Sequence, residues 1–171
     1  KEKKTNYMNL NNFTIKAQEA VQKAIEVAQA NNQQMIEPTH LLKGVMVVGE
    51  DVTGFLFQKL GVNGQNLERV LDKEIESYPR VSGGDPMLSR ETNAVFQKAL
   101  DLTSKMGDRF VSLEHLLLAI LHEKNTATRM MNDAGVTLKE LEAAVQELRK
   151  GENVTSQTAE ETYQALGKYA V

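Results

Sequence analysis

An internal repeat is the feature of this 171-residue sequence that most constrains its fold. When the chain is shifted by 75 residues, residues 13–46 overlay residues 88–121, and six of those 34 pairs are identical, including a His-Leu-Leu triplet. About two identities would be expected from ordinary composition. After a one-residue deletion the match resumes at an offset of 74 residues. We therefore predict two copies of one unit, residues 13–78 and 88–150, because the period exceeds the ~34–47 residues of common short helical repeats.

Each copy is predicted to fold as four helices. On the first helix of the first copy, apolar residues recur at three- and four-residue steps and form one stripe. The stripe consists of Ala17, Ala20, Val21, Ala24, Ile25 and Ala28. Thr14 is placed to cap that helix, Pro38 begins the second, and the third spans about residues 52–60 before Gly61. The fourth starts near Asn63. Its expected buried residues are Leu67, Val70, Leu71 and Ile75.

The second copy repeats these signals with other residues. Ser89 takes the capping position of the first helix, Gly107 ends that helix, and Ser112 begins the next. Thr137 and Glu140 have the spacing of a capping box for the last helix. No segment alternates at period two, so no sheet is predicted. The predicted fold class is all-α, with eight main helices as two pseudo-twofold-related four-helix repeats and a C-terminal linker helix.

The domain boundaries follow from the repeat and from composition. Residues 1–7 are charged and aperiodic, and we interpret them as a native extension or a cloning remnant. Residues 8–150 are predicted to pack as one body, because a four-helix unit of about 62 residues is marginal alone. A Pro- and Gly-containing loop over residues 79–86 joins the copies. The remaining segment, residues 151–171, is predicted to contain a polar helix over residues 159–169 that needs a partner surface.

Composition excludes several classes of protein. Apolar residues make up 41% and charged residues 25%, so the chain is not disordered. The longest apolar run has six residues, Leu116–Leu121, far short of the ~20 that span a bilayer. A net charge of −3 and a pI near 5.7 argue against a nucleic-acid partner. The absence of Cys excludes thiol chemistry, and without a secretory signal a cytoplasmic location is expected.

No catalytic residue, metal site or cofactor site is predicted in this chain. The three histidines, His40, His115 and His122, show no metal-ligand spacing. His40 and His115 occupy the same position in the two copies, and we interpret both as structural residues that bond to backbone at a helix start. Glu160 and Glu161 are interpreted as solvated surface. Because no phosphate-binding loop occurs, the chain is predicted not to be an enzyme.

Several segments resemble the Clp N-terminal domain family. They are Asn12-Phe13-Thr14, Ala20-Val21-Gln22-Lys23-Ala24 and Ile36-Glu37-Pro38-Thr39-His40-Leu41-Leu42 in the first copy, and Gly107-Asp108-Arg109-Phe110-Val111-Ser112 and Glu114-His115-Leu116-Leu117 in the second. The resemblance covers residues 8–150, and the doubling is itself a feature of that family. Residues 149–154 and 164–169 resemble the linker that joins this domain to the first ATPase module of ClpB-type disaggregases, so residues 151–171 are interpreted as the start of that linker.

This resemblance implies a function as well as a fold. Domains of this family lie at the end of a ring-forming, homo-hexameric AAA+ chaperone and are mobile on their linker. The implied function is non-catalytic: contact with unfolded or aggregated polypeptides and their delivery to the hexamer pore, in cooperation with the Hsp70 system. ATP and Mg would bind to modules outside this chain. The alternative is an adaptor-docking domain of a ClpA- or ClpC-type unfoldase that serves a protease.

Carried over by position, the resemblance also implies a peptide-binding surface. It would lie near the first helix of copy one and the junction of the first two helices of copy two. Its residues would be Thr14, Leu102, Asp108 and Glu114. Three of them also have a structural interpretation: Thr14 as a helix cap, Asp108 as a turn residue and Glu114 as an acid favoured by the helix dipole. Lys98 and His115 stand where an apolar groove would have Leu, so a shallow, partly polar site is expected.

Overall fold

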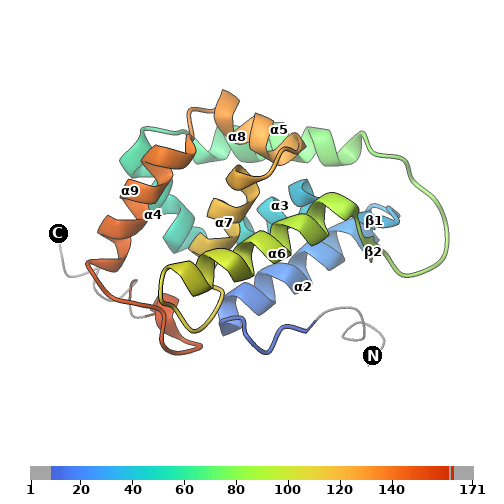
Figure 1. The fold of residues 1–171 in the computed structure, drawn as a ribbon. Helices are drawn as coiled ribbons and strands as arrows, with labels where there is room; N and C mark the ends of the chain where they lie inside the picture. Colours follow the sequence, from blue (N-terminus) through green and yellow to red (C-terminus); the bar gives the residue numbers. More distant parts are fainter. Residues whose placement is uncertain (1–8, 162, 164–171) are drawn as a thin grey trace.

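The structure, a computed structural model, describes residues 9–161 and 163 (Figure 1). The first repeat contains the helices α2 (Ile15–Ala30), α3 (Pro38–Val48), α4 (Glu50–Leu60) and α5 (Gly64–Glu76). The second repeat contains the helices α6 (Arg90–Lys105), α7 (Leu113–His122), α8 (Thr126–Asp133) and α9 (Leu138–Arg149). Within the described residues, the prediction of an all-α fold with eight main helices is therefore confirmed. The predicted extension over residues 1–7 and the greater part of the predicted helix over residues 159–169 lie outside the described residues.

The two repeats pack against each other through equivalent and interlocking helices. Within each repeat the first two helices form the main pair, α2 with α3 and α6 with α7. Between the repeats α3 contacts α7, α4 contacts α9, and α5 contacts α8, as Figure 1 shows at the centre and the edges of the molecule. The buried apolar side chains of both repeats form one continuous core.

Two short parallel pairings also join the repeats, and here the prediction of no sheet is wrong. Strand β1 (Met35–Ile36) pairs with strand β2 (Met87–Leu88), and Ile36 lies opposite Leu88. An isolated parallel bridge joins Phe13 to Val111. A shift of 75 residues converts one pairing into the other, so the two are related by the same pseudo-twofold symmetry as the helices. Two-residue strands are too short to show an alternating pattern in sequence.

The packing follows the sequence pattern closely, with one exception. All six stripe residues of α2 are buried, and the close approach of α3 is possible because Gly44 lies against the backbone of Ala20. On α5, Leu67, Leu71 and Ile75 are buried at four-residue spacing. The prediction that Val70 is buried is wrong: its side chain is 48% exposed. Val70 lies one residue, about 100° of helix rotation, away from the buried stripe.

Candidate functional site

Thr14 and Glu160 join the N-terminus of α2 to the C-terminal segment of the chain. The Thr14 hydroxyl accepts a hydrogen bond from the Ala17 backbone N–H (3.1 Å), so the predicted cap is confirmed. The same hydroxyl donates to the Glu160 Oε2 atom over 2.7 Å, and both side chains are fully buried. Thr14 therefore caps its helix and also binds a residue 146 positions away.

Glu160 also binds the N-terminus of α7, which contradicts its interpretation as solvated surface. Its Oε2 atom accepts a hydrogen bond from the Leu113 backbone N–H over 2.9 Å. That N–H is in the first helical position and has no partner within the helix. At the equivalent position of the first repeat, Pro38 has no N–H to satisfy. Burial and the neighbouring Glu114 raise the pKa of Glu160 to about 7.

Asp108 lies at the centre of a network of donors at the α6–α7 junction. Its Oδ2 atom accepts from His115 Nε2 (2.7 Å) and from Arg149 Nη1 (3.0 Å). Its Oδ1 atom accepts from the side chain of Asn153 (2.8 Å) and from the backbone N–H of Val154 (3.0 Å). Burial opposes ionisation of Asp108, but these donors outweigh it and hold the pKa well below its usual range.

Both repeats use a histidine to close the N-terminus of their second helix. The Ser112 backbone N–H donates to His115 Nδ1, and the Glu37 backbone N–H donates to His40 Nδ1, each over 2.9 Å. Nδ1 is therefore the acceptor, which leaves the proton on Nε2. The predicted structural role of the two histidines is confirmed. Burial lowers the pKa of His40 to about 4, so this ring is neutral.

Glu114 and Arg149 form a buried ion pair in the second repeat. The Arg149 Nε–H donates to Glu114 Oε2 over 2.9 Å, and both side chains are at most 3% exposed. Burial disfavours the charge on Arg149, but Glu114 and Asp108 outweigh it and raise the pKa of the guanidinium. The Glu114 Oε1 atom has no protein hydrogen-bond partner among the described residues. One cation thus serves two buried carboxylates.

The first repeat holds neutral residues at the three positions that are charged in the second. By the repeat alignment, Gln33, Thr39 and Ile75 correspond to Asp108, Glu114 and Arg149. The neutral set is also well bonded: Gln33 Oε1 pairs with His40 Nε2 (2.7 Å), and the Thr39 hydroxyl pairs with that of Tyr78 (2.8 Å). The same helical arrangement is thus built around a neutral set in one repeat and a charged set in the other.

The structure thus places three of the four predicted site residues in one region. Thr14 and Glu114 are fully buried, and Asp108 is 9% exposed. Leu102, on α6, is half-buried and packs against the core; its aliphatic side chain adds nothing to the polar network. None of the three polar residues lines an open groove, because residues after α9 lie against them. The predicted shallow, partly polar site is therefore covered by the chain itself.

Arg149 and Glu160 are the two members of this region that sequence reasoning missed. A signal for Arg149 was present, because it aligns with the buried Ile75 of the first repeat, and a charge at a core position indicates a buried partner. No signal existed for Glu160. Its segment lies after the last copy and has no counterpart in the repeat.

The surface beside the network binds main-chain atoms of the C-terminal segment. The Arg109 backbone N–H donates to the Val154 carbonyl (2.8 Å), and Asp108 accepts from the Val154 N–H. Further along, the Ile15 backbone N–H donates to the Gln157 carbonyl (2.9 Å). These bonds use main-chain atoms of the bound segment, so most of them would form with any sequence.

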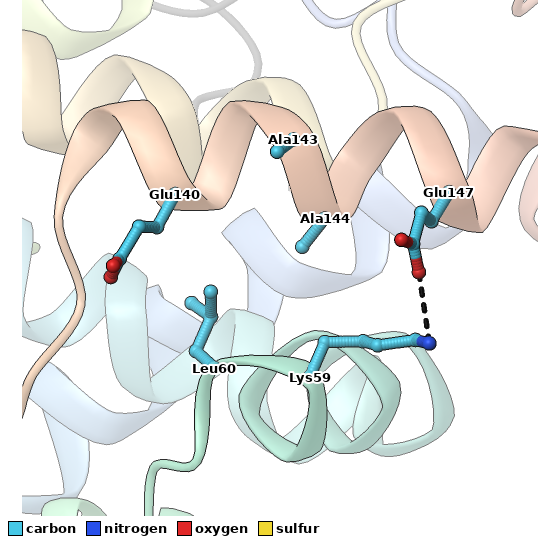
Figure 2. Close-up of a pocket in the computed structure, with 6 residues that line it drawn as sticks. All are labelled: Lys59, Leu60, Glu140, Ala143, Ala144 and Glu147. Atoms are coloured by element: carbon cyan, nitrogen blue, oxygen red, sulfur yellow. Dashed lines mark ion pairs between the residues drawn. The ribbon is translucent and has the colours of Figure 1, made fainter.

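A second concave feature lies between the repeats. Figure 2 shows a pocket of about 280 Å³ between α4 and α9, with Leu60 and Ala144 on its walls. Lys59 and Glu147 form an ion pair across its rim, with 2.9 Å between Nζ and Oε1. None of the residues that line this pocket belongs to the buried network around Asp108.

Two kinds of feature are absent from the part of the chain that the structure describes. No group of three or more His, Asp and Glu residues is arranged to hold a metal ion. No helix of the described residues is long and apolar enough to span a bilayer.

A protein-family model matches most of the chain. The chain belongs to the Clp repeat (R) N-terminal domain family, whose match covers residues 12–134. Among named relatives, the chaperone protein ClpB of Bacteroides thetaiotaomicron is 61% identical over 164 residues, 96% of this chain and 19% of that protein. The chaperone protein ClpB of Porphyromonas gingivalis is 55% identical over the same shares. The chain therefore spans about a fifth of the length of these relatives.

Solved structures show the same fold. The Hsp104 N-terminal domain of Candida albicans superposes with a TM-score of 0.78 at 21% identity, over 88% of this chain and 99% of that one. The N-terminal domain of the chaperone ClpD of Arabidopsis thaliana superposes with a TM-score of 0.67, also at 21% identity, over 85% and 99%. The all-α prediction and the resemblance to a ClpB-type N-terminal domain are confirmed by these matches.

Proposed function

We propose that this chain is the client-binding N-terminal domain of an ATP-dependent protein disaggregase. In this proposal it contacts unfolded or aggregated polypeptides and helps to deliver them to the pore of a cytoplasmic homo-hexamer that cooperates with Hsp70-type chaperones. The similarity to two ClpB chaperones supports the class of parent protein. ATP and Mg would bind to parts of the parent that lie outside this chain.

The observation that carries the proposal is the backbone-binding surface beside Asp108 and Ile15. A client-binding domain must accept many sequences, and main-chain hydrogen bonds are common to all of them. The Arg109 and Ile15 amides and the Asp108 carboxylate already hold main-chain atoms of Val154 and Gln157 in this way. Thr14, Asp108 and Glu114, which the family resemblance implies, are buried beneath the residues that follow α9, so a client would reach them only by displacing that segment.

Binding through so small a surface is expected to be weak, because ordering a client costs conformational entropy. Six such domains on one ring would engage a single aggregated particle together, and the effective concentration of the later contacts would raise the overall avidity. Weak single contacts would also let a client pass from the domain to the pore.

Amide chemical shifts of the whole chain test this proposal. We would titrate the isotope-labelled chain with a permanently unfolded protein, carboxymethylated α-lactalbumin. The expected result is a set of shifts at Ile15, Arg109 and Leu113, with no change around Leu60 and Ala144. The absence of shifts at all amides would refute client binding.

The second candidate function, an adaptor-docking domain, is favoured by the pocket of Figure 2. That pocket is preformed, has an apolar wall and carries a charged rim, which suits a folded partner of fixed shape. In the same titration, shifts confined to residues around Leu60 and Ala144 would favour docking of a folded partner and would argue against the client-binding surface.

A further inference from the structure

We propose that residues 153–161 and Tyr163 are a tethered occupant of the client site, and that this occupant shows the class of ligand the site takes. That class is a peptide that is extended at a small apolar residue, then turns, and six positions later presents a carboxyl side chain from a helical turn. The inference rests on the proposed client-binding function and adds to it a ligand chemistry and an intramolecular competitor.

The main chain of the segment is held as a bound peptide would be held. Val154 exchanges two hydrogen bonds with the domain, one from its N–H to Asp108 and one from the Arg109 N–H to its carbonyl. The Gln157 carbonyl accepts from the Ile15 N–H, and the Gln157 side chain donates to the Phe13 carbonyl over 3.2 Å. The contacts therefore extend along the segment from the α6–α7 junction to the start of α2.

Only a few side chains of the segment are buried in the domain. Val154 is fully buried, Ala159 is 6% exposed and Tyr163 is 3% exposed. The side chains between and beside them face solvent. They are Thr155, Ser156, Thr158 and Glu161. The amide side chains of Asn153 and Gln157 also donate hydrogen bonds to the domain, to Asp108 and to the Phe13 carbonyl. The site therefore contacts both the backbone and selected side chains of its occupant.

The carboxyl group of Glu160 is the most specific element of the occupant. Its Oε2 atom is bound by the Thr14 hydroxyl and the Leu113 N–H, so it lies between the N-termini of α2 and α7. Unpaired N–H groups and helix dipoles favour an acceptor with negative charge at such a position. An Asp or Glu side chain of a client, or a C-terminal carboxylate, would meet the same donors.

The docked segment also carries a cost that leaves it open to displacement. Glu160 is buried beside a second carboxyl group, that of Glu114, and the two like charges repel. The Glu160 Oε1 atom and the Tyr163 hydroxyl are buried without a protein partner among the described residues. A buried polar atom that lacks a partner weakens the docked state.

The first repeat is also covered by the segment that follows its last helix. The Tyr78 hydroxyl pairs with that of Thr39 over 2.8 Å, and the Val81 N–H donates to the Asn32 carbonyl over 2.8 Å. The second repeat differs in the chemistry of its covering segment, which places the Glu160 carboxyl group between two helix N-termini.

The test compares client binding by the intact chain and by variants that release the segment. The probe is fluorescently labelled carboxymethylated α-lactalbumin, followed by anisotropy. Glu160→Ala removes the carboxyl group, and Glu161→Ala changes the exposed neighbouring residue as the matched control. We expect Glu160→Ala to bind the probe about tenfold more tightly, because the competent state is then populated more fully, and Glu161→Ala to bind like the unaltered chain. Val154→Asp is a second release variant, should Glu160→Ala fail to fold.

A synthetic peptide with the sequence of residues 152–163 provides an independent measurement. We expect it to bind to the Glu160→Ala chain, and the same peptide with alanine at the position of Glu160 to bind about tenfold more weakly, because it lacks the acceptor for the Thr14 hydroxyl and the Leu113 N–H. Equal client affinities of the unaltered and released chains would overturn the inference and leave the proposed function standing. Binding of the peptide without any binding of the unfolded protein would support the tethered occupant and overturn the proposed function. Failure of both probes to bind would overturn both.

Discussion

Replacement of Arg149 by isoleucine tests whether the charged cluster of the second repeat is an interdependent unit. Arg149 is 3% exposed and is the cation that lies within 3.0 Å of both Asp108 and Glu114. Without it, two buried carboxylates keep their charge with no opposing guanidinium. Removal of one partner of a buried ion pair costs about 3–5 kcal/mol. For a chain of this size that loss corresponds to a fall in melting temperature of about 6–20 °C.

The first repeat supplies the matched control. The triple variant Asp108→Gln, Glu114→Thr and Arg149→Ile installs the residues that the first repeat carries at the equivalent positions. Because replacement of a buried ion pair by a neutral, well-packed set is often close to neutral, the triple variant should lie within about 1 kcal/mol of the unaltered chain. It would keep the same backbone and remove the charges as a set.

Urea unfolding followed by far-ultraviolet circular dichroism measures both variants. The deficit of Arg149→Ile should exceed that of the triple variant by at least about 2 kcal/mol, since only the single variant leaves buried carboxylates without their cation. A loss below about 1 kcal/mol for the single variant would contradict the reasoning, because it would mean that solvent reaches these carboxylates. A triple variant as unstable as the single one would show that the charged set is needed for folding.

Three further predictions concern backbone packing and two titrating side chains. Gly44→Ala would push a Cβ atom into the Ala20 backbone and should lower the free energy of unfolding by more than about 2 kcal/mol. Gly54→Ala on α4, with open space around it, should raise it by about 0.5–1 kcal/mol. Urea unfolding measures both changes. The buried, neutral His40 has a folded pKa of about 4, so its contribution to the free energy of unfolding is complete above pH 6.5 and is lost as pH falls towards 4. In an NMR titration the His40 ring resonances should therefore have a midpoint near pH 4. A midpoint above pH 6 would contradict the burial of this ring. For Glu160 the dependence of stability on pH runs in the opposite direction, because its folded pKa of about 7 lies above the ordinary 4.5. The stabilisation that Glu160 gives is therefore present below pH 4.5. About 3 kcal/mol of it is lost as pH rises through 7. The neutral Glu160→Gln chain should lack this loss. Hydrogen exchange would follow release of the C-terminal segment as a function of pH, and identical profiles for the unaltered chain and for Glu160→Gln would contradict the prediction.

The helical scaffold could be predicted from the sequence because its determinants are local and occur twice. The apolar stripe of α2, the cap at Thr14 and the paired histidines each depend on residues within one or two helical turns. The two parallel pairings between the repeats could not be predicted, since stretches of one or two residues are too short to show alternating apolar and polar residues. Val70 was misplaced because hydrophobicity alone does not fix which side of a stripe is covered.

The peptide-binding role of the four site residues stays a prediction, and the structure shows where those residues lie. Thr14, Asp108 and Glu114 were carried over by resemblance, and the structure brings them together. Their burial could not be predicted, because it depends on Glu160 and Val154, which lie beyond the repeat and reach the site only through tertiary contacts. The charge at Arg149 was visible in the alignment of the two copies, yet its two partners are set by three-dimensional packing.

The reciprocal exchange of pairings between the halves has a consequence for how the molecule comes apart. Phe13 of the first repeat pairs with Val111 of the second, and Leu88 of the second repeat pairs with Ile36 of the first. Each repeat therefore contributes the segment before its first helix to a pairing with the other repeat, as two subunits of a dimer with exchanged segments would. Unfolding of one repeat would remove the pairing partners of the other. Under mechanical force applied to either end, both repeats should therefore unfold in a single event.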